Sequence, residues 1–387
     1  MKYSILIVAI DCHFSHMTRF VCNLKQENPE VEIHYFTNKD RNDLPCGVVE
    51  NVAEVICQEK KKRSGIMGQI ENLFLLRKQF KKMARNRCYD VVNIHYPKYY
   101  IALIMTYLRR LSNKIVVTPW GSDILRVEGV KLKVLMKGVI NKCDFITTLE
   151  DGNIWRRLIS LSPNCNKKLR SVAWGSETID YITHHISETN TEAAKGHFGL
   201  SGKYVITCAY NAFPAQNHEK IIDAIVQIRR QLPNNLILLF PVSYGSYDKE
   251  EYVAKLKMRC QKEQLDALFV EDYLSVEDVF YLRMATDIFV HVQNTDAGCA
   301  SLQEYVLCNK KVVHGNWIHY PMFEHYSPLS YFPATDFSSL GKVILDAYHS
   351  DGINIAQVVI DNIQHNGWEV RRKEWNDFFY SLTSRKE

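Results

Sequence analysis

The chain has 387 residues, of which 46% are hydrophobic and 24% are charged, a composition that excludes a disordered chain and leaves room for two ordinary domains. Its eleven cysteines are scattered, without a C-x-x-C pair or zinc-ligand spacing, so a disulfide scaffold is excluded and reduced thiols in a cytoplasmic protein are favoured. The net charge of +5 is uneven: residues 1–190 contain 29 basic and 19 acidic side chains, and the remainder contains 19 and 24. The basic half therefore predicts an anionic partner.

The first apolar run, SILIVAI at 4–10, ends at an aspartate and predicts a strand rather than a secretory signal. Similar β-branched runs follow at 31–37, 90–96, 114–120 and 144–149, and a second series lies at 203–210, 235–242, 287–293 and 310–315. Helix-length segments separate these runs, as in parallel sheets. No apolar run approaches the ~20 residues that span a bilayer.

This pattern predicts an α/β protein with two Rossmann-like βαβ domains facing each other across a cleft. The expected boundaries are a first domain at 1–185, a linker at 186–202, a second domain at 203–350 and C-terminal helices at 351–387. Trp368, Trp375 and Leu382 recur at heptad spacing, so the last helix is expected to dock by its aromatic face, crossing back to the first domain.

Ligands of such sheets bind at the carboxyl ends of strands. Polar candidates follow the strands there: His13, Ser15 and His16; His95; Trp120, Gly121, Ser122 and Asp123; Tyr210, Asn211 and Gln216. His95 is expected to position a substrate or to bond a backbone carbonyl. Asp123 is expected to hold a hydroxyl or to cap a helix, and the Asn211 segment also suits a plain turn.

The segment TDAGCASLQEYV, residues 295–306, places Asp296 and Glu304 on either side of a run of small residues. Small residues admit a close ligand, and the N–H groups at a helix start attract anions. The pattern also allows a plain capping box between Ser301 and Glu304.

These motifs resemble retaining nucleotide-sugar glycosyltransferases of the GT-B fold, in a family-4-like branch of bacterial glycan transferases. The resemblance is carried by Asp296 and Glu304 after LSVEDVFYLRMATDIFV, by VVHGNW, and in the first half by VVTPWGSDIL, CDFITTLEDG and VAWGSETID. It implies that Glu304 bonds the donor ribose, that Asp296 lies near the transferred sugar, and that the N–H groups of Cys299, Ala300 and Ser301 face the sugar or diphosphate. With His95 and Asp123, Asp296 forms the expected catalytic set.

Two positions depart from the family pattern. Asp296 stands where a glutamate is usual, and Asn211 and Gln216 stand where an arginine and a lysine usually neutralise the diphosphate. Transferases that use lipid-linked sugars in bacterial envelope assembly resemble the chain in such replacements and in the segment PVSYGSY, which adds Tyr244 to the expected donor contacts. The chain has no D-x-D motif, so the resemblance implies retention of configuration without a metal or other cofactor.

Residues 60–87 contain ten basic side chains and one acid, with Leu73, Leu76, Phe80 and Met83 at helical spacing. This pattern predicts either a solvated surface helix or a patch that binds anionic lipid. With the resemblance, it implies a cytoplasmic enzyme on the inner face of a membrane, acting on a nucleotide-sugar donor and a lipid-linked glycan acceptor. The alternatives are a GT-B-fold nucleotide-sugar epimerase or hydrolase, and a non-enzymatic module for anionic lipid or nucleic acid. No nucleic-acid-binding signature occurs, so a nucleic-acid partner is not expected.

Overall fold

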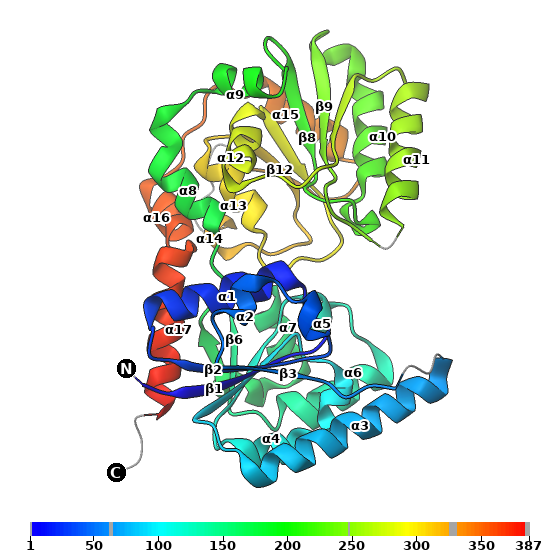
Figure 1. Ribbon diagram of the computed structural model, residues 1–387. Helices are drawn as coiled ribbons and strands as arrows, with labels where there is room; N and C mark the ends of the chain where they lie inside the picture. Colours follow the sequence, from blue (N-terminus) through cyan, green and yellow to red (C-terminus); the bar gives the residue numbers. More distant parts are fainter. Residues whose placement is uncertain (1, 62–64, 247, 325–330, 384–387) are drawn as a thin grey trace. The chain divides into compact units, whose positions relative to one another are not determined.

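The computed structural model describes residues 2–61, 65–246, 248–324 and 331–383. The chain forms two compact units: unit 1 comprises Met1–Gly175 and Glu369–Glu387, and unit 2 comprises Ser176–Trp368. Each unit contains one sheet whose strands are all parallel, with helices on both faces (Figure 1). The prediction of two Rossmann-like units is therefore confirmed.

The sheet of unit 1 has the order β3-β2-β1-β4-β5-β6-β7. Its strands are β1 (Ser4–Ala9), β2 (Glu32–Thr37), β3 (Glu54–Cys57), β4 (Val91–His95), β5 (Ile115–Thr118), β6 (Phe145–Thr148) and β7 (Leu169–Ser171). Its helices are α1 (Phe14–Glu27), α2 (Cys46–Val49), α3 (Gly65–Asn86), α4 (Met105–Leu111), α5 (Ser122–Leu125), α6 (Gly129–Leu135) and α7 (Asn153–Leu161), with the 3₁₀ segment η2 (Tyr99–Leu103) before α4. The strand order reverses between β1 and β4, which is where such sheets bind ligands at their carboxyl ends.

Unit 2 has the order β10-β9-β8-β11-β12-β13. Its strands are β8 (Tyr204–Cys208), β9 (Leu236–Pro241), β10 (Ala267–Val270), β11 (Ile288–His291), β12 (Lys311–Gly315) and β13 (Tyr331–Ala334). Its helices are α8 (Glu177–His185), α9 (Thr191–His197), α10 (His218–Ile228), α11 (Lys249–Lys262), α12 (Val276–Ala285), α13 (Ala300–Leu307), α14 (Pro321–Glu324), α15 (Leu340–His349) and α16 (Gln357–Gln364). The corresponding reversal lies between β8 and β11.

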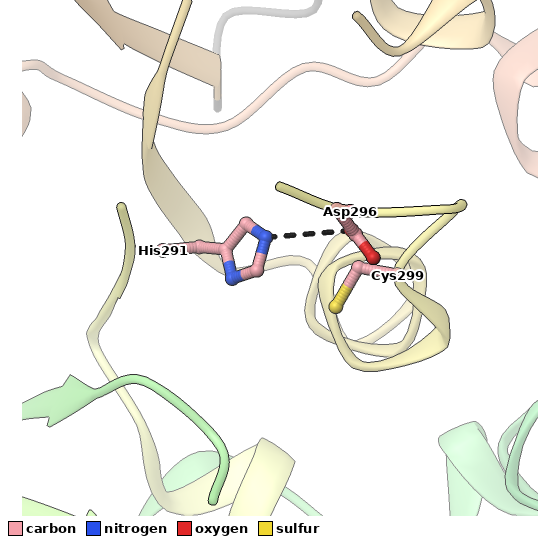
Figure 2. Close-up of side chains that lie close together, drawn as sticks. All are labelled: His291, Asp296 and Cys299. Carbon is pink, nitrogen blue, oxygen red and sulfur yellow. Dashed lines mark ion pairs between the residues drawn. The ribbon is translucent and has the colours of Figure 1, made fainter. Parts of the chain in front are cut away.

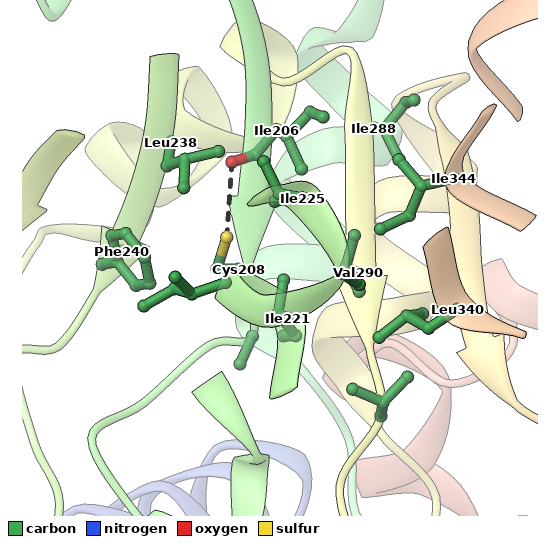
Figure 3. Close-up of a cluster of buried hydrophobic side chains, with 14 of the residues drawn as sticks. Ile206, Cys208, Ile221, Ile225, Leu238, Phe240, Ile288, Val290, Leu340 and Ile344 are labelled. Atoms are coloured by element: carbon green, nitrogen blue, oxygen red, sulfur yellow. Dashed lines mark hydrogen bonds between the residues drawn. The ribbon is translucent and has the colours of Figure 1, made fainter. Parts of the chain in front are cut away.

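Buried side chains alternate between the two faces of the second sheet, as the pleat of a strand requires. Ile206, Leu238 and Val290 pack with Ile221, Ile225, Leu340 and Ile344 of α10 and α15 (Figure 3). Their sequence neighbours Val205, Leu239 and Phe289 pack on the other face with Leu302, Tyr305 and Val306 of α13. Burial on both faces explains why these strands are continuously apolar in sequence, and it fixes α13 against the sheet.

The C-terminal helix α17 (Trp368–Thr383) packs in unit 1 from Glu369 onward. Trp375 and Phe379 are fully buried and contact Phe20 of α1, with ring centroids 5.0 and 6.5 Å away. Trp375 Nε1 also donates to the carbonyl of Ala173 at 2.9 Å. Burial of two aromatic side chains contributes several kcal/mol at about 1.5–3 kcal/mol each, so this helix is a structural part of unit 1.

The boundary between the units differs from the predicted one. Unit 2 begins at Ser176 rather than after residue 185, and the segment predicted as a linker, 186–202, contains α9, which packs against α12. Ile179 and Ile182 of α8 and Ala194 of α9 are buried, but these few apolar residues stand in a polar stretch. The sequence pattern therefore did not predict that these residues are buried. Among the described residues, no helix has both the length and the apolar character needed to span a bilayer.

Candidate functional site

The candidate site of unit 2 lies at the carboxyl edge of its sheet, where β8 and β11 are neighbours. Ala209, Tyr210 and Asn211 follow β8, and the segment that contains Asp296 follows β11. Ala209 has φ of 61°, a left-handed conformation that is unfavourable for alanine and is typical of functional loops. The chain therefore accepts local strain where these two strands end.

Asp296 lies in a hydrogen-bonded group with His291 and Tyr320 (Figure 2 shows Asp296 and His291). The Tyr320 hydroxyl donates to Asp296 Oδ2 at 2.6 Å and lies 2.7 Å from His291 Nε2, which is 3.6 Å from Asp296 Oδ2. Burial alone raises the pKa of Asp296, but the nearby His291 ring and the hydrogen bonds from Tyr320 and the Gly298 N–H outweigh it and lower that pKa below its usual value. The site therefore keeps Asp296 as a carboxylate.

The other oxygen of Asp296 holds the loop that leads into α13. Oδ1 accepts from the N–H groups of Ala297 at 2.8 Å and Gly298 at 3.4 Å. Gly298 has φ of 150°, which a residue with a side chain rarely adopts. Cys299 is the N-cap of α13, and its Sγ accepts from the Leu302 N–H at 3.4 Å. Asp296 thus fixes the start of the helix.

The capping box predicted as an alternative for Ser301 and Glu304 does not form. The helix begins at Ala300, one residue before Ser301, with Cys299 as its N-cap. The N–H groups of Ala300 and Ser301 lie in the first turn, where helices lack internal acceptors, and the polypeptide supplies them no acceptor among the described residues. This first turn is therefore able to bind an anion.

Glu304 forms a buried ion pair with Arg283 of α12. Glu304 Oε2 lies 3.0 Å from both Nε and Nη2 of Arg283, and the two side chains are only 5% and 8% exposed. Glu304 Oε1 accepts from the Ser176 hydroxyl at 3.1 Å, while Arg283 also donates to the Ser301 and Tyr305 hydroxyls. Neither Arg283 nor Ser176 was predicted from the sequence.

The amides Asn211 and Gln216, predicted as donor contacts, are both buried at this edge. Gln216 Nε2 donates to Gln293 Oε1 at 3.0 Å, and Gln216 Oε1 is buried without a partner among the described residues. Asn211 lies near the hydroxyl of Tyr244, and desolvation raises the pKa of Tyr244 to about 12 although Asn211 lowers it. Tyr244 therefore lies within electrostatic range of both Asn211 and Cys299.

The nearby side chains His218 and Lys220 supply no cation to these amides. His218 is fully buried and bonds the hydroxyl of Tyr252 at 3.1 Å, and burial lowers its pKa to about 4. Lys220 is exposed on α10. Arg283 is the cation that the structure brings to the start of α13, and its charge is balanced by Glu304.

A metal could in principle be held by His291, Asp296 and Cys299, whose ligand atoms lie within 4.8 Å of one another. Metal binding requires the thiolate form of cysteine. Burial raises the pKa of the Cys299 thiol well above its usual value, and Asp296 adds to that increase. A metal bound by these three side chains would therefore have to displace the proton of the Cys299 thiol.

In unit 1, Asp123 and His95 are almost completely buried, with 1% of each exposed. Asp123 accepts from the N–H groups of Trp120 and Gly121, the shortest bond being 2.7 Å, so it holds the turn before α5. Burial raises the pKa of Asp123 to about 6 although these bonds lower it. Catalytic roles for Asp123 and His95 stay predictions.

His95 ends β4 and packs against the ring of Phe20, with centroids 4.6 Å apart. Neither ring nitrogen has a hydrogen-bond partner among the described residues, so the carbonyl bond considered from the sequence is not formed. Burial lowers the pKa of His95 to about 3, so the ring is neutral.

An aromatic cluster surrounds the ends of β1, β4 and β5. The rings of Trp120 and Trp174 meet edge to face at 5.3 Å, and His16 lies 5.3 Å from Trp120 and 6.0 Å from Trp174. His16 is exposed, while His13 bonds Ser15 at 2.8 Å. Trp174 was missed from the sequence because it follows no predicted strand.

The apolar stripe predicted on the basic helix is mostly core. Leu76, Phe80 and Met83 of α3 are buried, because this face packs onto the sheet and α4. A different set of apolar side chains is exposed in the first half of α3: Ile66 at 76%, Met67 at 57%, Ile70 at 42% and Phe74 at 66%. Lys62 and Arg63 of the predicted patch lie outside the described residues.

Comparisons with known proteins agree with this architecture. Residues 6–149 match the family model described as glycosyl transferase 4-like, whereas no curated protein matches the chain. Similar structures include a glycosyltransferase from Rickettsia africae, with TM-score 0.71, 12% identity and full coverage of both chains. They also include sucrose-phosphate synthase from Thermosynechococcus elongatus (TM-score 0.70, 14% identity, both chains fully covered).

A third similar structure is HepE from Anabaena in complex with UDP and glucose, with TM-score 0.63, 13% identity and coverage of 99% of this chain and 98% of that one. The identities are low, so these likenesses establish the fold. The chain therefore has the GT-B fold, and its residues 6–149 are similar to the glycosyl transferase 4-like family, in agreement with the fold and family resemblance found in its sequence.

Proposed function

We propose that this protein is a glycosyltransferase that takes a sugar from a nucleotide-sugar donor bound by unit 2. The observation that carries this proposal is the convergence, at one sheet edge, of a fixed carboxylate, buried amides and the open first turn of α13. The HepE structure is described as a complex with UDP and glucose, which makes a uridine diphosphate sugar the first donor to test.

The first turn of α13 would bind the diphosphate. The N–H groups of Ala300 and Ser301 supply hydrogen bonds and the positive end of the helix dipole, which stabilise a departing anion without reorganisation. Asn211 and Gln216 would add amide donors where related enzymes use cations. Because the charge of Arg283 is balanced by Glu304, neutral donors carry more of the stabilisation here.

Asp296 would lie beside the transferred sugar and orient the loop before α13. Its two oxygens already accept from Tyr320 and from backbone N–H groups, so its main effect is to position Gly298 and Cys299. Glu304 would accept from the ribose hydroxyls with the lone pairs that Arg283 and Ser176 leave available, since a carboxylate offers about four such positions.

The acceptor would be a glycan, and the aromatic cluster of Trp120, Trp174 and His16 offers rings against which a sugar can stack. A lipid-linked acceptor accords with the exposed apolar side chains of α3. Ile66, Met67, Ile70 and Phe74 are accompanied by the exposed cations Arg77, Lys78, Lys81 and Lys82, a combination that binds anionic lipid surfaces. The enzyme would then act at the cytoplasmic face of a membrane, with retention of configuration and without a metal.

Calorimetric titration with UDP and with UDP-sugars tests this proposal. Asp296→Asn keeps an oxygen that can accept from the N–H groups of Ala297 and Gly298, so the variant is expected to retain UDP affinity. It removes the carboxylate proposed to lie beside the sugar, so turnover or affinity for the complete donor should fall. Asp336→Asn, in an exposed turn of the same unit, is the matched control and should change neither. Failure to bind any nucleotide or nucleotide sugar would reject the proposal.

Product analysis separates transfer from the alternatives. A transferase forms a new glycosidic bond only when the acceptor is present, and its anomeric configuration, read by NMR, reports retention or inversion. A hydrolase or epimerase would consume the donor or change its sugar without an acceptor.

A further inference from the structure

A second polar cavity lies at the opposite, amino-terminal edge of the sheet of unit 2. Its volume is about 200 Å³, and its lining comes from the starts of three neighbouring strands: Tyr204 begins β8, Asp287 precedes β11, and Lys310 precedes Lys311, the first residue of β12. Thr191 of α9 completes its wall. Because the strands are parallel, this edge is distinct from the one that holds Asn211 and Asp296.

Asp287 and Glu192 share one close cation, Lys195. Asp287 Oδ2 lies 3.0 Å from Nζ of Lys195, whose side chain is 6% exposed, and it accepts from the Val205 N–H at 2.7 Å. Lys310 and Lys311 make no ion pair within the described ranges of the chain. Lys311 Nζ instead donates to the carbonyl of Ser350 at 2.8 Å. No carboxylate lies within ion-pair distance of either lysine among the described residues, although Asp287 and, for Lys311, Asp351 act on them at longer range.

Lys310 is the more unusual of these two lysines. It is 5% exposed, yet its ammonium group has a single hydrogen-bond partner in the described part of the molecule, Thr191 Oγ1 at 2.7 Å. An ammonium has three N–H donors, and leaving a buried donor unsatisfied is costly. Burial lowers the pKa of Lys310 to about 8, and the charge of Asp287 offsets only part of this effect.

We propose that this cavity binds a phosphate group, either inorganic phosphate or the phosphate of a small phosphomonoester. A phosphate anion would accept the unused donors of Lys310 and interact with the positive charges of Lys310 and Lys311, neither of which has a carboxylate within ion-pair distance among the described residues. The Thr191 hydroxyl, which accepts from Lys310, can donate its own proton to the same anion. A volume of about 200 Å³ accommodates such a group, but it is small for a whole nucleotide sugar.

Binding of inorganic phosphate and of glycerol 3-phosphate, each measured by calorimetry at constant ionic strength, tests this proposal. Lys310→Met is expected to weaken phosphate binding at least tenfold, while Lys342→Met, an exposed lysine on α15 of the same unit, should leave it unchanged. Preference for glycerol 3-phosphate would identify the phosphomonoester as the ligand, and equal affinity would identify the phosphate alone.

A measurement on the wild-type protein guards against a Lys310→Met variant that does not fold. After reductive ¹³C-methylation of the lysines, phosphate is expected to raise the pKa of Lys310, because a bound anion stabilises the ammonium form. If millimolar phosphate neither binds nor changes this pKa, or if both lysine variants bind it equally, the cavity is not a phosphate site. Neither outcome depends on glycosyltransferase activity.

Discussion

Glu304→Gln removes the negative charge from the buried ion pair of unit 2 and changes the side chain little in size. Both partners are almost inaccessible, at 8% for Arg283 and 5% for Glu304. A guanidinium cannot release its proton at accessible pH, so Arg283 stays charged in the variant. The Ser301 and Tyr305 hydroxyls and the new amide oxygen still accept from it, but none supplies a counter-charge.

Breaking one side of a buried ion pair typically costs about 3–5 kcal/mol of unfolding free energy. For a domain of the size class of unit 2, each kcal/mol lowers Tm by about 2–4 °C. The expected decrease in the Tm of unit 2 is therefore roughly 6–20 °C. Replacing both partners, as Arg283→Met with Glu304→Gln, should recover part of this loss because no unpaired charge remains.

Differential scanning calorimetry measures the stability, and titration with UDP, well below Tm, measures binding. Glu250→Gln, an exposed position at the start of α11, is the control and should stay within about 0.5 kcal/mol of wild type. Ribose binding by Glu304 predicts a further loss of about 1.5–3 kcal/mol in UDP affinity, roughly tenfold or more. A stability loss below about 1 kcal/mol would refute the reasoning about the ion pair. Lost stability with unchanged UDP affinity would make Glu304 a structural residue only.

Three further predictions concern pH, lipid and metal. The folded pKa of Asp123 is raised from 3.8 to about 6, so its contribution to stability is present below pH 4 and is lost as pH rises toward 6, by about 3 kcal/mol. Urea unfolding of the wild type and of Asp123→Asn measures the free energy of unfolding at each pH. The wild type should lose stability over this range relative to the variant, and identical pH profiles of the two proteins would contradict the prediction. The double variant Ile70→Ser, Phe74→Ser should bind anionic liposomes several-fold more weakly than the wild type, whereas the control Lys142→Ser, outside α3, should bind as the wild type does. If the wild type does not bind anionic liposomes, or binds neutral liposomes equally well, α3 is not a lipid-binding patch. Transfer activity should survive excess EDTA, and its complete loss with rescue by magnesium or manganese would contradict metal independence.

The residue types of the candidate site could be read from the sequence, but their partners could not. Asp296 and Asn211 follow predicted strands, so they were located by the rule that ligands bind at the carboxyl ends of parallel strands. The same rule would also have identified His291. Arg283 carries no comparable signal, since an arginine within a helix is usually a solvated residue. Its pairing with Glu304 arises because α12 and α13 pack together, a contact that local sequence does not encode.

The spacing of apolar residues along a helix likewise did not reveal which of them pack against other elements of the protein. In α3 the spacing of Leu76, Phe80 and Met83 indicated an amphipathic helix correctly. Which apolar face is covered by protein and which remains exposed depends on the neighbouring elements. The structure buries these three residues and exposes Ile70 and Phe74 instead.

The sequence by itself determined the two parallel sheets, because their central strands are buried on both faces and are therefore continuously apolar. All nine strands that it predicted are present. The four that it missed, β3, β7, β10 and β13, are the edge strands of the two sheets. All of their residues except Leu169 and Ala334 are partly buried or exposed, so the hydrophobic signal that reveals a central strand is weak in them. Only the tertiary structure decided the positions of these edge strands, the boundary between the units at Ser176 and the Arg283–Glu304 ion pair. Each of these depends on packing between segments that are distant in the chain.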